Sequence, residues 1–115
     1  MAPKNPAGPV ASGTLGDDGS APLSPIIHGR ARLLILSFLV RLPRLHTFTD
    51  LRDGLAFTDG SLSANLAKLE SAGLVEIQRS FVGRKPRTAV RISANGRREF
   101  KRYIAQLKKI VPGLN

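Results

Sequence analysis

The 115-residue sequence contains no cysteine, which excludes disulfides, thiolate metal sites and cysteine nucleophiles. It has no apolar run close to the roughly 20 residues that a membrane-spanning helix needs. The segment after Met1 also has no apolar stretch typical of a secretory signal. These absences indicate a protein of the reducing cytoplasm with no membrane partner.

Acidic residues are scarce, because eight Asp and Glu stand against 18 Lys and Arg, for a formal net charge of +10. Residues 25–115 hold 17 of the basic residues and six of the acidic ones, a net charge of +11. Like charges repel one another in a compact domain, so an excess of this size favours a polyanionic partner. Charge alone leaves DNA, RNA and an anionic membrane open.

Large apolar side chains are almost absent from residues 1–23, which are rich in Pro, Gly, Ala and Ser. Such a segment cannot offset its ordering entropy by burial, and it is predicted to be a disordered tail. Residues 24–115 are predicted to form one folded domain.

Three helices are predicted in the first half of that domain. A dense apolar run predicts a buried helix that begins near Ser24-Pro25 and ends before Pro43. Thr47, followed three residues later by an acid, resembles a capping box that opens a second helix. The third helix spans 59–72 and ends at a glycine. Its leucines at i, i+4 and i+7, which are Leu62, Leu66 and Leu69, form one buried face. The short connection between the second and third helices is typical of a helix-turn-helix.

After the third helix the apolar period changes from 3.6 to 2, which predicts a β-hairpin with strands at 75–81 and 88–92. The basic segment 82–87, which contains Gly and Pro, forms the predicted loop between them. Ser93 then caps a last helix over about 94–111. The fold class is therefore mainly α with a β-hairpin wing (α+β), in the order helix-helix-helix-hairpin-helix.

The third helix is the first candidate binding element, because the side opposite its leucines is small and polar. Ser61, Ala64, Asn65 and Lys68 are assigned to this side, with Ser63 at the flank. An α-helix fits the DNA major groove, where Asn can contact an adenine edge with two hydrogen bonds and Lys can reach phosphate. An ordinary solvated helix face would have a similar composition.

The hairpin loop is the second candidate, because Arg84, Lys85 and Arg87 cluster there. A basic tip can enter the minor groove, whose negative potential attracts Arg. Lys and Pro also protect sheet edges from pairing with other chains, but three bases in four positions exceed that need.

The last helix is amphipathic, with basic residues outside an apolar stripe. This stripe either completes the core, pairs with a second copy of the chain or lies on a membrane surface. We favour pairing, because small DNA readers often dimerise on two half-sites. The predicted dimer interface consists of Phe100, Tyr103, Ile104, Leu107 and Ile110.

Catalytic signatures are missing from the sequence. His28 and His46 are its only histidines, and neither has an acid or a nucleophile at a diagnostic spacing. A lone His near a helix end or in a loop usually lies on the surface or caps the helix. The sequence also lacks a phosphate-binding glycine loop and a cluster of metal ligands, so we expect no enzyme, no metal and no cofactor.

In the order described, these segments resemble the winged helix DNA-binding domain of small prokaryotic regulators of the MarR- and ArsR-like grouping. The resemblance covers about three quarters of the chain, from Ser24 to about Ile110, and rests on five segments: 32–36, 48–51, 58–75 (Thr58-Asp59-Gly60-Ser61 through Lys68-Leu69-Glu70 to Gly73-Leu74-Val75), 81–88 (Phe81-Val82-Gly83-Arg84-Lys85-Pro86-Arg87-Thr88) and 93–97.

The resemblance implies a homodimer that inserts the third helix into the major groove and lays the wing on adjacent backbone or minor groove. It implies base contacts by Ser61, Ala64 and Asn65, although many relatives carry His at the position of Asn65. By the same resemblance, phosphate contacts fall to Ser63 and Lys68, and wing contacts to Arg84, Lys85 and Arg87. Thr49, in the second helix, is also counted as DNA-contacting.

The expected function is sequence-specific binding of double-stranded DNA by a cytoplasmic, nucleoid-associated transcriptional regulator that acts as a repressor. The alternatives are a winged helix that binds protein or structured RNA, and a nonspecific nucleoid protein. A small-molecule effector could bind between subunits without leaving a signature in the sequence.

Overall fold

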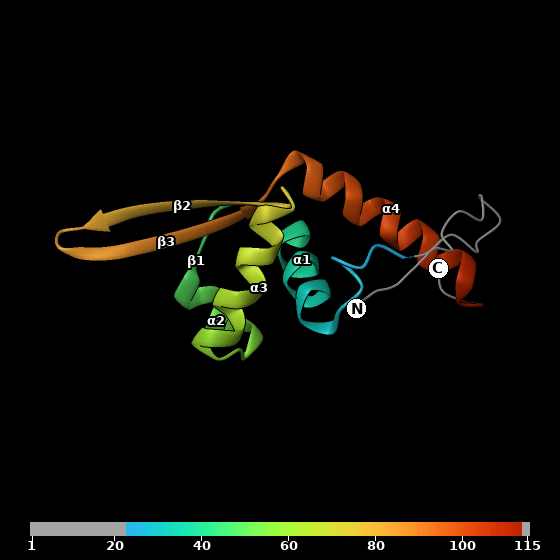
Figure 1. Cartoon of the computed structure of the whole chain (residues 1–115), viewed down its shortest axis with the longest axis horizontal. Helices are drawn as coiled ribbons and strands as arrows, with labels where there is room; N and C mark the ends of the chain where they lie inside the picture. The colour runs from blue at the N-terminus through green and yellow to red at the C-terminus, as the bar shows by residue number, and fades with distance from the viewer. Residues whose placement is uncertain (1–22, 114–115) are drawn as a thin grey trace, which may run out of the picture.

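The computed structural model of the chain describes residues 23–113. A long β-hairpin projects from the packed helices (Figure 1). The elements, in chain order, are α1 (Arg30–Arg41), β1 (His46–Thr47), α2 (Phe48–Leu55), α3 (Asp59–Ser71), β2 (Val75–Val82), β3 (Lys85–Ile92) and α4 (Ala94–Ile110). This is a winged helix, so the predicted fold class is confirmed. Residues 1–22 of the predicted tail lie outside the described residues.

The first helix begins later than the sequence indicated. Its first residue is Arg30, and the predicted start at Ser24-Pro25 is wrong. The Ser24 carbonyl accepts hydrogen bonds from the backbone N–H groups of Ile27 (3.2 Å) and His28 (2.7 Å), which closes a separate turn. Gly29 then adopts an extended conformation as the N-cap of α1, so the turn and the helix are distinct.

Side-chain caps set the starts of α2 and α3. The Thr47 hydroxyl accepts a hydrogen bond from the Asp50 backbone N–H (3.1 Å), and the Thr58 hydroxyl accepts one from the Ser61 N–H (3.1 Å). Between the helices, Ala56 takes the left-handed conformation that ends α2. The predicted cap at Thr47 and the helix-turn-helix are confirmed, and the structure adds the cap at Thr58.

The hydrophobic core lies where α1, α3, the base of the hairpin and α4 meet. Leu62, Leu66 and Leu69 are each at most 2% exposed, which confirms the predicted inner face of α3. Burial of a leucine contributes about 1.5–3 kcal/mol. The other core members are Ile27, Ile35, Leu36, Leu39, Leu51, Leu74, Val75, Val90, Ile92, Phe100 and Tyr103.

The sheet has three strands in the order β1-β3-β2, all antiparallel. The sequence did not indicate β1, which is only two residues long. His46 of β1 is buried and donates a hydrogen bond from Nε2 to the Leu42 carbonyl (2.7 Å), near the end of α1. It is therefore a capping histidine, as expected of a lone His near a helix end.

The hairpin strands are longer than predicted, and the loop is shorter. Pairing continues to Val82 opposite Lys85, so the predicted six-residue loop 82–87 is wrong. The turn consists of Gly83 and Arg84 alone. Gly83 has φ +64°, a conformation that favours glycine in two-residue hairpin turns.

Helix α4 starts against the backbone that follows α3. Ser93 caps it by accepting a hydrogen bond from the Gly96 N–H (2.8 Å), as predicted. A Cβ on Gly96 would collide with the Leu74 carbonyl oxygen, so only glycine allows this approach. From there α4 runs away from the hairpin to the opposite end of the molecule (Figure 1). Among residues 23–113, no helix is long and apolar enough to cross a membrane.

Candidate nucleic-acid interface

The outward face of α3 is built from short side chains. All of its members are exposed: Gly60, Ser61, Ser63, Ala64, Ala67, Lys68 and Ser71. Because the three core leucines occupy the other side, nothing bulky limits how closely this face can approach a surface. Thr49 is also exposed, in the first turn of α2. The sequence placed Ser61, Ser63, Ala64 and Lys68 here but did not single out Gly60, Ala67 and Ser71.

Asn65 lies differently from its neighbours on α3. Its side chain is half-buried and turned toward α1, where its Oδ1 accepts a hydrogen bond from Arg32 Nη1 (3.1 Å). Its Nδ2 donates to the Ser61 carbonyl (2.9 Å). Both ends of the amide thus make a hydrogen bond within the chain, so the predicted contact with adenine would have to use the remaining lone pair and N–H of this amide or displace these bonds.

Arg32 connects this amide to the turn before α1. Its Nε donates to the Ile26 carbonyl (2.6 Å), while Nη1 holds Asn65. The turn also reaches α4, since His28 Nδ1 lies 2.8 Å from the Tyr103 hydroxyl. Residues before α1 therefore help to fix the orientation of α3.

An ion-pair cluster joins α2 to the start of α3. Arg52 contacts the carboxylates of Asp53 (2.9 Å) and Asp59 (2.8 Å). The hydrogen bond to Asp53, followed by that to Asp59, raises the pKa of Arg52. The cluster neutralises two acids close to the exposed end of α3, where a negative charge would repel a polyanion.

A hollow of about 180 Å³ lies between α3 and the hairpin. It is lined by Phe48, Ser63, Leu66, Ala67, Ile77, Arg79 and Thr88. Arg79 is held at its edge by two hydrogen bonds of 3.1 Å to Glu70 of α3. These bonds lower the pKa of Glu70 below its ordinary value, so the pair is ionised at neutral pH. The sequence pattern indicated no role for Arg79.

The basic residues of the hairpin do not share one face. Strand register places Arg79 and Phe81 on the side that faces α3. Lys85 and Arg87 of β3 pair with Val82 and Ser80 and project to the other side. The predicted cluster of Arg84, Lys85 and Arg87 stays at the hairpin end, with Lys85 and Arg87 on one face and Arg84 in the turn, whereas Arg79 lies on the other face.

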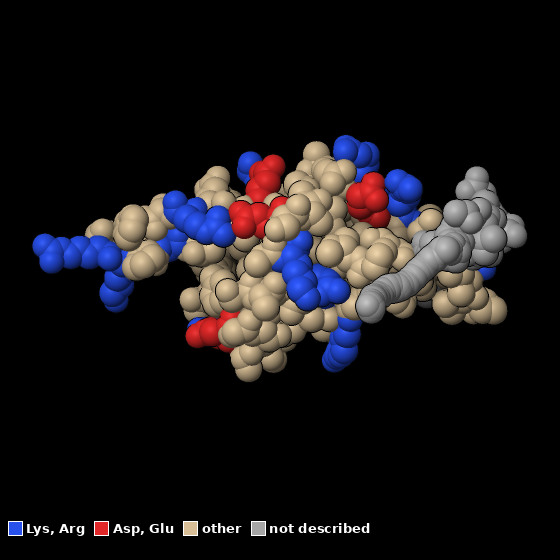
Figure 2. Space-filling view, in the orientation of Figure 1, with Lys and Arg blue, Asp and Glu red and all other residues tan. Residues whose placement is uncertain are grey.

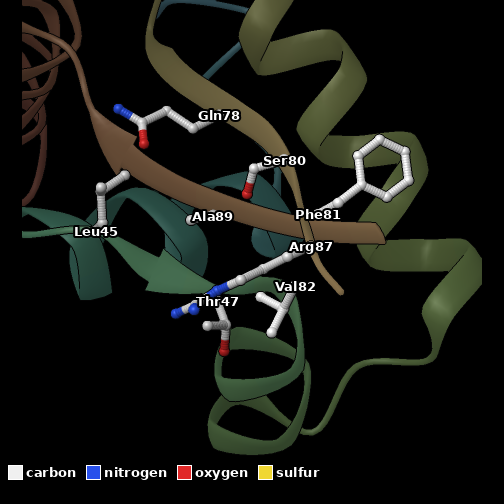
Figure 3. Close-up of a pocket in the computed structure, with 8 residues that line it drawn as sticks. All are labelled: Leu45, Thr47, Gln78, Ser80, Phe81, Val82, Arg87 and Ala89. Carbon is white, nitrogen blue, oxygen red and sulfur yellow. The ribbon is translucent and has the colours of Figure 1, made fainter. Parts of the chain in front are cut away.

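A second hollow, of about 360 Å³, opens on that other side of the sheet (Figure 3). Arg87 extends across it toward Thr47 of β1, and Gln78 and Ser80 of β2 line the adjoining part of the hollow. Apolar residues, among them Leu45 and Val82, complete the lining, so this hollow is mixed in polarity and continuous with the hairpin tip.

The end of the hairpin carries only positive charge. Figure 2 shows basic side chains at the tip with no acidic side chain beside them on the visible face. Five of the six carboxylates within residues 23–113 pair with an arginine elsewhere in the fold. Within the same range no carboxylate pairs with Lys68, Arg84, Lys85 or Arg87.

The apolar stripe of α4 divides into two parts. Phe100 (8% exposed) and Tyr103 (2% exposed) are buried in the core of the chain itself, so they are not available to a partner as the sequence had suggested. Ile104 and Leu107 are half-buried, and Ile110 is 45% exposed. Only this second part offers an apolar surface.

The fold, the outward face of α3 and the basic end of the hairpin are those of a winged helix that binds nucleic acid. Comparison with known proteins defines the family. A family model described as a winged helix DNA-binding domain matches residues 31–111. The chain therefore belongs to the winged helix DNA-binding domain family.

Individual relatives agree with this assignment. An uncharacterized protein of Methanocaldococcus jannaschii is 34% identical over 85 residues, which cover 74% of this chain and 91% of that protein. The structure of a transcriptional regulator homologue from Pyrococcus horikoshii is similar, with a TM-score of 0.71 and 35% identity, covering 80% of this chain and 90% of that one.

A PadR family transcriptional regulator from Eggerthella lenta is also similar, with a TM-score of 0.60 and 26% identity over 70% of this chain and 77% of that chain. The overoxidized AbfR bound to DNA has a TM-score of 0.63 at 19% identity, covering 73% of this chain and 60% of that one, a likeness of fold alone. The structural relatives thus include transcriptional regulators.

Replacing Asn65 by Ala tests which role this residue has. Loss of the contact with Arg32 is expected to lower the free energy of unfolding by about 1 kcal/mol. Because the amide is already occupied, affinity for different duplexes is expected to change by a common factor. Thermal unfolding and binding to a panel of single-base-pair variants measure the two effects. Relaxed preference at one base pair, with unchanged stability, would instead assign Asn65 to base contact.

Proposed function

We propose that this protein is a sequence-specific regulator of transcription that binds double-stranded DNA as a homodimer and acts as a repressor. In this proposal α3 enters the major groove, and the hairpin meets the adjacent minor groove. The observation that carries it is the outward face of α3, which is small, polar and exposed beside cations that have no described acidic partner.

The fit to the major groove follows from side-chain size. A groove about 12 Å wide admits an α-helix when the facing side chains are short. Ser61 and Ala64 allow such an approach, with Ser able to contact base edges and Ala able to contact a thymine methyl group. Lys68, two turns further along α3, is suited to a phosphate. Asn65 serves to position α3, as its bonds to Arg32 and Ser61 suggest.

The end of the hairpin suits a contact with phosphates. Arg84 lies in the turn, and Lys85 and Arg87 project to the side away from α3. These three cations can therefore contact the phosphates along one edge of a groove that the tip enters. Repression needs nothing further, because a bound dimer can exclude polymerase from an overlapping promoter.

The first experiment is a selection of bound duplexes from random sequence, followed by titrations of the enriched duplex at several salt concentrations. Log affinity is expected to fall linearly with log salt, by about 0.9 per phosphate contact. Arg84→Ala should weaken binding to all sequences alike and reduce this slope by about 0.9. Lys101→Ala, an equal loss of charge on the exposed side of α4, is the control and should leave the slope unchanged.

Three outcomes contradict the proposal. Selection that enriches no motif removes sequence specificity, and stronger binding to duplex RNA than to duplex DNA removes the substrate class. In an in vitro transcription assay, an enriched site that overlaps a promoter should reduce transcript in proportion to occupancy. Unchanged or increased transcript would remove repression.

The homodimer part of the proposal rests on the distal half of α4. Ile104 and Leu107 are half-buried, and Ile110 and Val111 are 45% and 40% exposed. This part of α4 lies at the end of the molecule away from the hairpin, so a second copy seated there leaves α3 uncovered (Figure 1). Two copies would then present two α3 helices to half-sites one helical turn apart.

Sedimentation equilibrium of Ile110→Lys tests the dimer. Placing a charge on the apolar surface is expected to raise the dimer dissociation constant at least about tenfold, since burial of Ile contributes about 1.5–3 kcal/mol when complete. Ala105→Lys adds the same charge on the exposed side of α4 and should have little effect. A monomeric wild type, or equal effects of the two substitutions, would exclude this interface.

The Glu70–Arg79 pair gives a gain-of-binding prediction. Glu70→Gln removes the carboxylate that holds Arg79 beside the hollow between α3 and the hairpin. Affinity for duplex DNA at moderate salt should rise about twofold to fivefold, and the salt slope should increase.

Glu76→Gln is the matched control for that experiment. It makes the same change in charge and releases Arg91, whose side of the hairpin is opposite to α3. Its effect should be clearly smaller. Equal gains from both substitutions would mean that net charge, rather than the position of Arg79, governs affinity.

A further inference from the structure

Two large apolar side chains are exposed at the end of the hairpin. Phe81 is 71% exposed and Val82 is 59% exposed, more than any other large hydrophobic residue within 23–113. Single exposed hydrophobics are common, but these two are adjacent and lie far from the core. Exposing them to water costs free energy, so an apolar surface that covers them would recover it.

The two side chains point to opposite sides of the hairpin. The ring of Phe81 and the side chain of Val82 project away from each other in Figure 3. The register agrees, with Phe81 opposite Pro86 on one face and Val82 opposite Lys85 on the other. A flat protein surface could cover only one of these faces. A groove with two walls covers both.

The surroundings of the tip indicate the chemistry of those walls. Arg84, Lys85 and Arg87 lie within a few residues of Phe81, and no acid occurs between Glu76 and Glu99. The surface that fits must therefore combine apolar area with dense negative charge. The minor groove of DNA has both, because deoxyribose rings form its walls and phosphates line its rims.

The length of the hairpin also suits this groove. Phe81 is six residues beyond Val75, the one buried residue of β2, a distance of about 20 Å at 3.3 Å per residue. Half a helical turn of DNA, which separates a major groove from the next minor groove, is about 17 Å. With α3 in the major groove, the tip can therefore reach the minor groove.

We propose that Phe81 is an apolar wedge that packs against the minor-groove wall, opens the groove and bends the duplex toward the major groove. Val82 contacts the opposite wall, and the neighbouring cations contact its phosphates. This inference rests on the proposed function and adds a mode of recognition to it. Preference at the tip comes from DNA deformability, so flexible TA or CA steps should be favoured there.

The test compares Phe81→Ala with Phe81→Leu on the selected duplex. Phe81→Ala should weaken binding at least about tenfold and reduce the bend measured by circular-permutation gel mobility. The salt slope should stay at the wild-type value, since no phosphate contact is lost. Phe81→Leu, which keeps most of the apolar volume, should stay within about threefold of wild type.

Leu42→Ala is the control for loss of an exposed apolar side chain, because Leu42 is 42% exposed just after α1. It should leave affinity and bending unchanged. Thermal unfolding of the free variants establishes that they fold, which their exposed positions favour.

The results separate this inference from the function on which it rests. If wild type fails to bind any duplex, the proposed function is wrong. If wild type binds and bends DNA but Phe81→Ala does so equally well, only the wedge is wrong. A reduced salt slope, or a change in the oligomeric state of the free protein with unchanged DNA affinity, would also overturn it.

Discussion

The structure depends on the burial of one side of α3. Leu62, Leu66 and Leu69 together contribute several kcal/mol, a large part of the net stability of a domain of this size. Because the inner side is fixed in this way, the direction of the outer side is fixed as well. The same three residues that stabilise the fold therefore decide which side chains are offered to DNA.

Polar contacts refine this orientation without supplying much stability. Arg32 ties Asn65 of α3 to the turn before α1, and Arg79 ties Glu70 of α3 to β2. The exposed Glu70–Arg79 ion pair adds little to stability, and the part-buried hydrogen bond between Arg32 and Asn65 contributes about 1 kcal/mol. Their effect is geometric, since they restrain α3 relative to the turn before α1 and to the hairpin in the free protein.

The sequence predicted those features that depend on local chemistry. Periodicity placed the leucines of α3, and the hydroxyls of Thr47, Thr58 and Ser93 marked the helix starts. It failed where a distant partner decides the outcome. The two residues of β1 form a strand only because β3 lies next to them, and spacing alone did not indicate the contact of Asn65 with Arg32. The loop at 82–87 was wrong because strand pairing continues past the point where alternating burial ends.

The excess positive charge destabilises the free protein through repulsion between like charges. Nearly all described carboxylates are used in joints such as Arg52–Asp59 and Arg91–Glu76, so the remaining cations repel one another in the free protein. Added salt screens this repulsion and stabilises the free fold, but it also weakens the attraction to phosphate. Bound DNA relieves the same repulsion directly and stabilises the folded state by linkage. The positive charge therefore lowers the stability of the isolated domain but contributes favourably to the complex, as expected when the partner is a polyanion.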